Sequence, residues 1–207
     1  MLKRTLLNSW EYNVIGIDPA QNNLGATITS VFGVYPLAVS GTNSFFCRKK
    51  SAVVVNDFVD EFIAELEDKG KRSAIDLAVI EDYTMQWRSF VAFGMGEMGG
   101  LIRDIFYERD IPFLLCPPNS MRSFCGIPPR TKSKVGKKKI TAWAESEFDF
   151  KSDESRWNDR QNETDAFVHS IIGQCFLSYK LESTLPIELS EKQLKILGKL
   201  KERIQNE

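Results

Sequence analysis

Residues that build zinc sites, disulfide frameworks and membrane spans are scarce in this sequence. Its 207 residues include one histidine and four cysteines, and the cysteines lie far apart without a C-x-x-C pair. This pattern argues against a structural zinc site or a disulfide scaffold and favours a reducing compartment. No run of about 18 or more apolar residues occurs, and Asn8 and Glu11 interrupt the apolar start before a cleavable signal could form. We therefore expect a cytoplasmic protein without a membrane-spanning helix.

The chain also lacks an excess of charge of either sign. It has 27 Lys+Arg and 28 Asp+Glu, for a net charge of -1. Such a balance provides no overall attraction to nucleic-acid phosphates. The charges are segregated, however, because residues 130–139 hold six basic and no acidic residues, whereas residues 143–165 hold eight acidic and three basic ones. The sequence therefore allows nucleic-acid binding that is local to one face and dependent on salt.

The spacing of apolar residues predicts strands and helices that follow one another along the chain. Apolar runs predict an antiparallel meander of three strands, then two further strands, and helical spacing predicts the elements between and after them. This order predicts an α/β fold in which helices cover both faces of a mixed sheet. The expected strands are residues 12–18, 24–32, 35–46, 74–81 and 112–116. The expected helices are residues 51–68, 88–109, 137–148 and 162–179, with a short helix from Pro117 to about Gly126 and a charged loop over residues 149–161.

The C-terminal residues form a separate pattern after Pro186. Leu194, Leu197, Leu200 and Ile204 lie along one stripe of a predicted terminal helix. Because the length suits one sizeable core, we expect one domain over residues 1–182 and a helical extension over residues 183–207. The stripe either covers the core of its own chain, which is the commoner case, or contacts a second copy.

Three acidic residues occupy positions that are unfavourable for a lone carboxylate. Asp18 ends an apolar strand in G-I-D-P, Glu81 ends another in V-I-E-D-Y, and Asp165 lies near the start of an apolar helix in N-E-T-D-A. Such acids need a partner or a metal. Carboxylate ligands favour Mg2+ or Mn2+, and two ions about 3.5–4 Å apart can activate water and stabilise the leaving oxygen of a phosphodiester. The plainer alternative is that Asp18 caps a turn and the other two lie on solvated ends.

Several motifs of the chain together resemble those of a known protein family. The segment G-I-D-P-A-x-x-N-L-G, then V-I-E, C-P-P-N-S-M-R, G-K-K-K-I and N-E-T-D-A resemble, in order and spacing, the RuvC-type Holliday-junction resolvases of the RNase H-like superfamily. The resemblance covers about residues 12–180. It implies an RNase H-like nuclease from a phage or a bacterium, acting as a homodimer with two Mg2+ ions, for which Mn2+ can substitute. Such enzymes make paired nicks in four-way DNA junctions during DNA recombination and repair.

The resemblance also implies roles for individual residues. Asp18, Glu81 and Asp165 would be the catalytic metal ligands. The family usually has an acid or a histidine three residues before the last aspartate, where this chain has Asn162, a tentative ligand that brings no charge. Weaker metal binding, a displaced role for Glu163 or His169 behind the ligands, and an inactive variant therefore all stay open.

The basic stretch and a nearby aromatic segment are candidates for DNA contacts. Lysines there would hold phosphates, although a solvated charge run is the plainer alternative. Tyr83 and Trp87 follow Glu81 and would stack on an unpaired base, or else pack on the next helix. The strongest basic candidates are Lys137, Lys138 and Lys139, supported by Lys134, Lys132, Arg130 and Arg122.

The sequence leaves other functions open. The chain could be an RNase H-like nuclease that cuts RNA–DNA hybrids or packaging intermediates, or a protein that binds branched DNA without cutting it. The G-I-D-P turn also suits actin-like ATPases, but those need two such domains and this chain is too short. Residues 94–99 match G-x-G-x-x-G by letter only, because they lie far beyond the preceding strand. Their small side chains favour a close approach to another helix, within the core or across a dimer interface.

Overall fold

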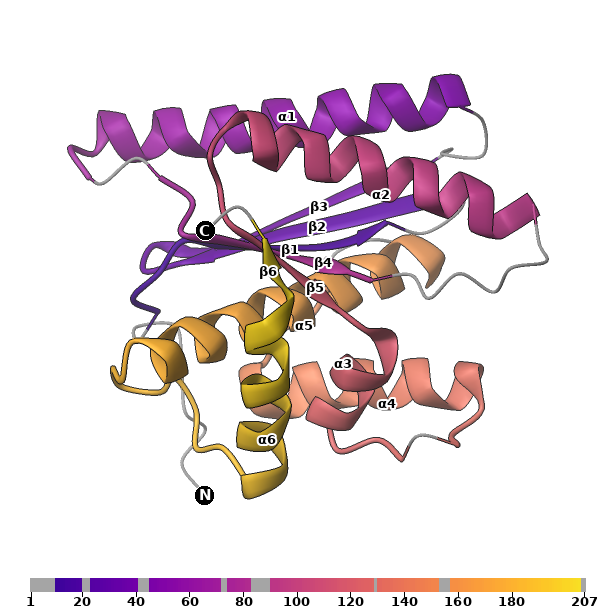
Figure 1. Ribbon diagram of the computed structural model, residues 1–207, viewed down its shortest axis with the longest axis vertical. Coiled ribbons are helices and arrows are strands. Elements are labelled where there is room, and N and C mark those ends of the chain that lie inside the picture. The colour runs from indigo at the N-terminus through magenta and orange to yellow at the C-terminus, as the bar shows by residue number, and fades with distance from the viewer. Residues whose placement is uncertain are drawn as a thin grey trace.

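A six-stranded sheet forms the centre of the chain (Figure 1). The first three strands are the predicted antiparallel meander, the next two join in parallel, and a short last strand is antiparallel, in the order β3-β2-β1-β4-β5-β6. The strands are β1 (Val14–Pro19), β2 (Asn23–Ser30), β3 (Gly33–Ser40), β4 (Leu77–Glu81), β5 (Phe113–Cys116) and β6 (Ile204–Gln205). The computed structural model describes residues 10–19, 23–40, 45–71, 74–82, 90–128, 130–152 and 157–205.

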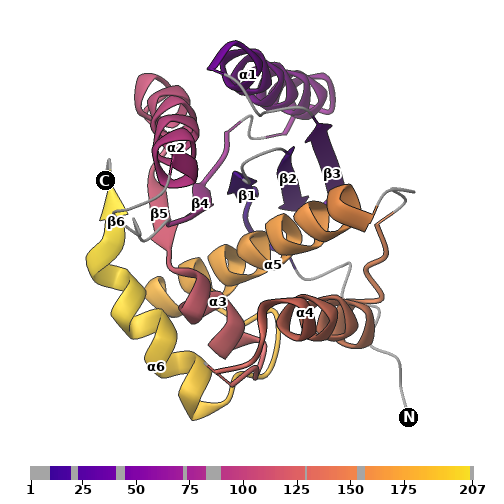
Figure 2. The same ribbon diagram turned by 90° about the vertical axis from the view of Figure 1, so that its right-hand side faces the viewer.

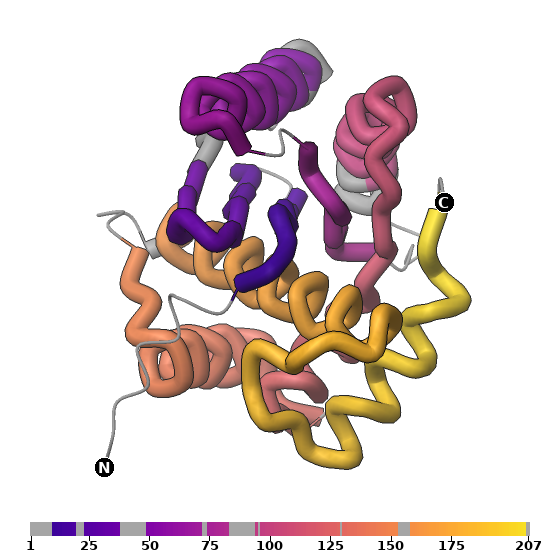
Figure 3. The backbone as a smooth tube through the Cα atoms, turned by 90° about the vertical axis from the view of Figure 1, so that its left-hand side faces the viewer, coloured from indigo at the N-terminus to yellow at the C-terminus, as the bar shows by residue number. Residues whose placement is uncertain are grey.

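Helices cover both faces of this sheet, which confirms the predicted α/β architecture (Figure 2). Two helices lie on one face, and α5 lies on the other with a further layer of three helices outside it. Figure 3 shows from the opposite side that α5 runs between the strands and that outer layer. The helices are α1 (Phe45–Asp68), α2 (Phe90–Glu108), α3 (Pro118–Phe124), α4 (Ser133–Phe148), α5 (Trp157–Lys180) and α6 (Glu191–Leu200). Of the helices in these ranges, none has both the length and the apolar character that crossing a bilayer requires.

Each face of the sheet has its own apolar core. In β1, Ile15 and Ile17 belong to the core beneath α1 and α2, whereas Val14 belongs to the core beneath α5. In β4, Leu77 and Val79 belong to the α5 side. Because successive side chains of a strand point to opposite faces, this alternation determines which face the residues at the strand ends meet.

Glycines allow α5 to lie unusually close to the sheet. A Cβ atom on Gly16 of β1 would be 2.0 Å from the carbonyl oxygen of Ala166. A Cβ atom on Gly173 of α5 would be 2.5 Å from Val14 Cγ1. Only a residue without a side chain fits at such distances, so glycine at these positions sets the depth at which α5 packs.

Several element boundaries differ from the predicted ones. The predicted strand over residues 35–46 ends at Ser40, and its last residues begin α1 instead. Helix α5 begins at Trp157, inside the predicted loop, and α4 begins at Ser133 rather than at residue 137. The early start of α5 has a physical reason, since the buried carboxylate of Asp159 accepts a 2.6 Å hydrogen bond from Asn23 Nδ2 of β2. Such a tertiary partner is not visible in the local pattern.

The C-terminal segment returns to the sheet. Leu197 and Leu200 of α6 are buried in the core beneath α5, so this part of the predicted stripe covers the chain's own core. The predicted helix ends earlier than expected, because a 3-10 turn, η2 (Lys201–Arg203), follows α6 and Ile204 then lies in β6. Arg203 Nη1 donates a 2.6 Å hydrogen bond to Asp82 Oδ2. The C-terminal segment is thus tied to the residue directly after Glu81.

Candidate active site

Two acids meet at one end of the sheet because their strands are parallel neighbours. Ile17 of β1 pairs with Ile80 of β4, so Asp18 and Glu81 are the next residues along adjacent strands. The alternation along β1 and β4 turns both side chains toward α5, where Val14 and Leu77 also point. Helix α5 brings the third acid, Asp165, since the next residue, Ala166, packs directly over Gly16. The structure therefore brings together all three predicted acids.

Their pKa values show that the three carboxylates act on one another. Burial, followed by the charges of Asp18 and then Asp165, raises the pKa of Glu81 well above its usual range. Burial and the charge of Asp18 raise the pKa of Asp165 to about 7, against the opposing effects of Lys137, Gln161 and Arg122. Asp18 and Asp165 are only 5% and 4% exposed. Burial is thus the largest cause of both raised pKa values, and the repulsion between the carboxylates adds to it.

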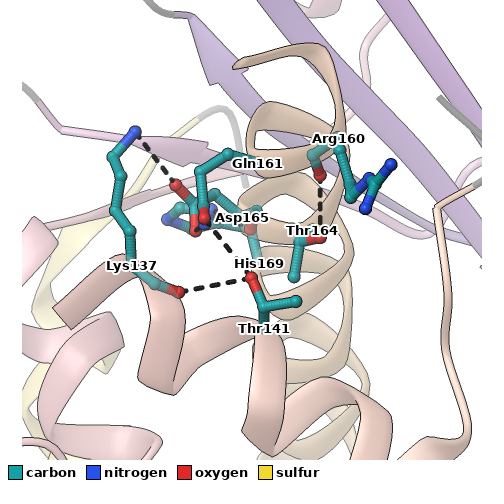
Figure 4. A network of polar contacts seen from close by, with 7 residues as sticks. All are labelled: Lys137, Thr141, Arg160, Gln161, Thr164, Asp165 and His169. Carbon is teal, nitrogen blue, oxygen red and sulfur yellow. Dashed lines mark hydrogen bonds and ion pairs between the residues drawn. The ribbon is translucent and has the colours of Figure 1, made fainter. Parts of the chain in front are cut away.

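A polar network connects Asp165 with α4 (Figure 4). Gln161 Nε2 donates a 2.8 Å hydrogen bond to Asp165 Oδ1, and Lys137 Nζ lies 3.8 Å from Asp165 Oδ2. The Thr141 hydroxyl lies 3.3 Å from both Gln161 Oε1 and the Lys137 carbonyl oxygen, and it shares its proton between them. Each oxygen of the Asp165 carboxylate therefore has a defined neighbour.

Three predicted residues of α5 take different places. His169 and Glu163 were expected behind the metal ligands, and Asn162 was expected as a tentative ligand. His169 is fully buried, and its Nδ1 donates a 2.8 Å hydrogen bond to the Asp165 carbonyl oxygen. Burial lowers the pKa of His169 to about 4, so the ring is neutral at neutral pH. Glu163 accepts a hydrogen bond from the Ser152 hydroxyl and, two residues before Asp165, faces a different side of α5. Asn162 is buried and three residues before Asp165, on the side of α5 that Asp165 shares.

The basic stretch divides into one inward lysine and an exposed group. Lys137 is turned toward Asp165, whereas Arg130, Lys132, Lys134, Lys138 and Lys139 are exposed to solvent. Arg122 of α3 is partly buried, and its positive charge lowers the pKa of both Glu81 and Asp165. The aromatic candidates Tyr83 and Trp87 lie outside the described residues.

The chemistry of these donors fits a divalent cation. Buried carboxylates with raised pKa values are stabilised when a cation binds their oxygens, and carboxylate oxygens are the ligands that Mg2+ and Mn2+ prefer. Within the described ranges, no three His, Cys, Asp or Glu side chains are spaced as a preformed metal cage. Carboxylates that repel one another are expected to stand apart until a cation draws them together.

Three features of this region were not predicted from the sequence. Gln161 and Thr141 were missed, although a buried amide one turn before an acid of the same helix is a usable signal. Gly16 has a signal of its own, because a glycine inside a strand often marks a close backbone approach. Residues 94–99 lie inside α2, as their distance from the strand predicted, but Cβ atoms on Gly99 or Gly100 would meet no atom within 4 Å. At Gly99, which belongs to that segment, the described part of the chain brings no other helix close, and a close approach across a dimer interface stays a prediction.

Comparison with known proteins gives a likeness in structure only. No protein-family model matches the sequence, and no curated protein matches it. A structure of T. thermophilus RuvC in complex with a Holliday junction substrate superimposes with a TM-score of 0.55 at 13% identity, covering 86% of this chain and 100% of the other. The chain has a RuvC-type resolvase fold. A second Thermus thermophilus RuvC structure agrees, with a TM-score of 0.52 at 12% identity over 84% of this chain and 99% of the other.

A third solved structure is more distant. The yeast mitochondrial Holliday junction resolvase superimposes with a TM-score of 0.42 at 16% identity, covering 97% of this chain and 86% of the other. The two RuvC structures support the RNase H-like arrangement of a mixed sheet flanked by helices, which is the fold predicted from the motifs.

Proposed function

We propose that this chain is a metal-dependent endonuclease that resolves four-way or other branched DNA junctions by paired phosphodiester hydrolysis. One observation carries the proposal, namely that Asp18, Glu81 and Asp165 converge from β1, β4 and α5 beside the basic start of α4. The RuvC-type fold supports it, since one RuvC structure of this fold is bound to a Holliday junction substrate.

The three acids would hold two Mg2+ ions, or Mn2+ in their place. Asn162 lies on the same side of α5 and would add a neutral amide oxygen. When bound, the ions would lower the pKa of an attacking water and stabilise the leaving oxygen of the phosphodiester. Gln161 keeps one oxygen of Asp165 in place, and the exposed lysines of α4 would hold the DNA backbone.

Paired nicks in a junction require two cutting centres. Because one chain brings together one set of acids, we propose that the enzyme acts as a homodimer on branched DNA. Its role would lie in DNA recombination and repair in the cytoplasm of a bacterium or of a phage-infected host.

The decisive assay uses a synthetic four-way junction with each strand labelled separately. Wild-type protein in Mg2+ should place symmetric nicks in two opposed strands, while EDTA should prevent cutting. The variant Asp18→Asn should bind the junction and leave it uncut, because it loses a charged ligand with little change in shape. Nicking by Asp18→Asn, or cutting of an RNA–DNA hybrid with no action on the junction, would contradict the proposal.

The position of Asn162 favours a second candidate function. A neutral side chain on the acid-bearing side of α5 lowers the charge available for metal, and a protein of this kind could bind branched DNA without cutting it. Junction binding in Ca2+ with no nicking in Mg2+ or Mn2+ would support this alternative. Cleavage gained by Asn162→Asp would identify the missing charge as the cause.

A further inference from the structure

Lys137 differs from every other cation of the stretch 130–139. Its side chain is 39% exposed and its Nζ lies 3.8 Å from Asp165 Oδ2, whereas the other basic side chains in the stretch are exposed. Lys137 lies in the second turn of α4, directly before Lys138 and Lys139. Its ammonium group is thus close to a buried acid and at the same time accessible from solvent.

The carboxylate oxygen that Lys137 faces is the one left for a metal. Asp165 Oδ1 accepts the hydrogen bond of Gln161 Nε2, so this carboxylate oxygen already has a partner. The side-chain oxygen of Gln161 is in turn within reach of the Thr141 hydroxyl. Oδ2 has Lys137 as its cationic neighbour. A cation bound through Oδ2 would repel the ammonium group at this distance, so a metal and Lys137 compete for the same oxygen.

The charge of Lys137 also acts beyond Asp165. Of the cations that favour the ionised forms of Glu81 and Asp165, Lys137 has the largest effect on each. A lysine carries its charge on a flexible four-carbon stem with three donors, and it binds phosphate readily as a point charge. The same group can therefore neutralise the acids or reach a phosphate at the surface of α4.

We propose that Lys137 is an internal counter-ion that exchanges between Asp165 and a DNA phosphate, and that it thereby couples metal binding to DNA binding. This inference rests on the proposed function. A phosphate that draws Lys137 outward frees Asp165 for the metal, and a metal that displaces Lys137 frees the ammonium group for the phosphate. By reciprocity of linked equilibria, each ligand then tightens the binding of the other by the same factor.

Two binding measurements on the full chain test the proposal. Mn2+ affinity without DNA is measured by electron paramagnetic resonance, and junction affinity is measured by fluorescence anisotropy in EDTA and in Ca2+. Lys137→Met should bind Mn2+ about 5- to 10-fold more tightly than wild type, and the tightening of junction binding by Ca2+ should be smaller in it than in wild type. Lys137→Arg keeps the charge and should stay close to wild type in both measurements.

Lys151→Met is the matched control. Lys151 Nζ lies 3.6 Å from Asp149 Oδ1 in an ion pair whose side chains are 70% and 74% exposed, so its loss removes one positive charge without uncovering a buried acid. It should leave both the Mn2+ affinity and the effect of Ca2+ on junction binding unchanged. An unchanged or weaker Mn2+ affinity in Lys137→Met, or an unchanged effect of Ca2+ on its junction binding, would overturn the proposal. Wild-type protein that binds neither Mn2+ nor the junction would instead overturn the proposed function itself.

Discussion

Gly25 of β2 lies directly beneath the backbone of Asn162 on α5. A Cβ atom on Gly25 would be 2.1 Å from the Asn162 carbonyl oxygen and 2.4 Å from its carbonyl carbon. Gly25 is also the cross-strand partner of Asp18. This contact therefore determines how closely the acid-bearing start of α5 can approach the acid at the end of β1.

Gly25→Ala should push the start of α5 away from the sheet. Because the atoms nearest to the added Cβ belong to the backbone and cannot turn aside, the free energy of unfolding should fall by about 1–3 kcal/mol, and nicking should fall more steeply than junction binding. Urea denaturation and the junction assay measure both effects. Gly99→Ala is the control, since its Cβ meets open space within α2 and should raise stability by about 1 kcal/mol. Equal stability of the two variants would contradict the close packing.

Gln161→Leu should make metal binding more dependent on pH. The Gln161 hydrogen bond lowers the pKa of Asp165, so its loss should raise the pH at which Mn2+ binding is half-maximal by about 1–2 units. Thr141→Val removes only the hydroxyl beside Gln161 Oε1 and should cause a smaller shift in the same direction. Mn2+ titrations from pH 5.5 to 8.5 measure the midpoint. A midpoint that stays at its wild-type pH in Gln161→Leu would show that the amide does not support the carboxylate.

The metal-free protein should lose stability as the pH rises. An acid whose pKa is higher in the folded chain than in the unfolded chain favours folding when protonated. For Asp165 this stabilisation is complete below the ordinary pKa of 3.8 and is lost as the pH passes about 7, and Glu81 acts in the same direction. Thermal unfolding without metal should therefore show a Tm that decreases from pH 5.5 to 8, by about 2–4 °C for each kcal/mol of stability. Asp165→Asn should flatten that decrease, and a Tm that rises over this range in the wild type would contradict the assignment.

Lys138→Ala and Lys139→Ala should each weaken junction binding and reduce its dependence on salt. Both side chains are exposed on α4, the helix that carries Lys137, and removing one lysine–phosphate interaction should lower the slope of log affinity against log salt by about 0.9. Lys192→Ala and Lys195→Ala, in exposed positions of α6, serve as controls and should leave the slope unchanged. Junction titrations over a range of salt concentrations give the slopes. Equal slopes in all four variants would indicate that residues 130–139 are a solvated run of charge that does not contact phosphates.

The local spacing of apolar residues was sufficient to predict most of the fold. The strands that carry Asp18 and Glu81 and the helix that carries Asp165 were predictable, because hydrophobic periodicity follows from which side of an element is buried. The antiparallel meander and the α/β class followed from connection lengths and from the order of elements. The three acids could be singled out from the sequence as well, since a carboxylate at the end of an apolar strand is costly wherever the strand lies.

The sequence by itself therefore determined most of the elements and singled out the three acids, whereas only the tertiary structure decided the last strand, β6, and what surrounds the acids. The run of basic residues is nearly uniform in sequence, yet Lys137 alone turns toward Asp165 because α4 packs along α5 at that position. The early start of α5 depends on Asn23, a residue far away in the chain. Contacts of this kind arise from the depth and register at which α5 lies on the sheet. Glycines of β1, β2 and α5 set this depth, and these elements come into contact only when the chain is folded.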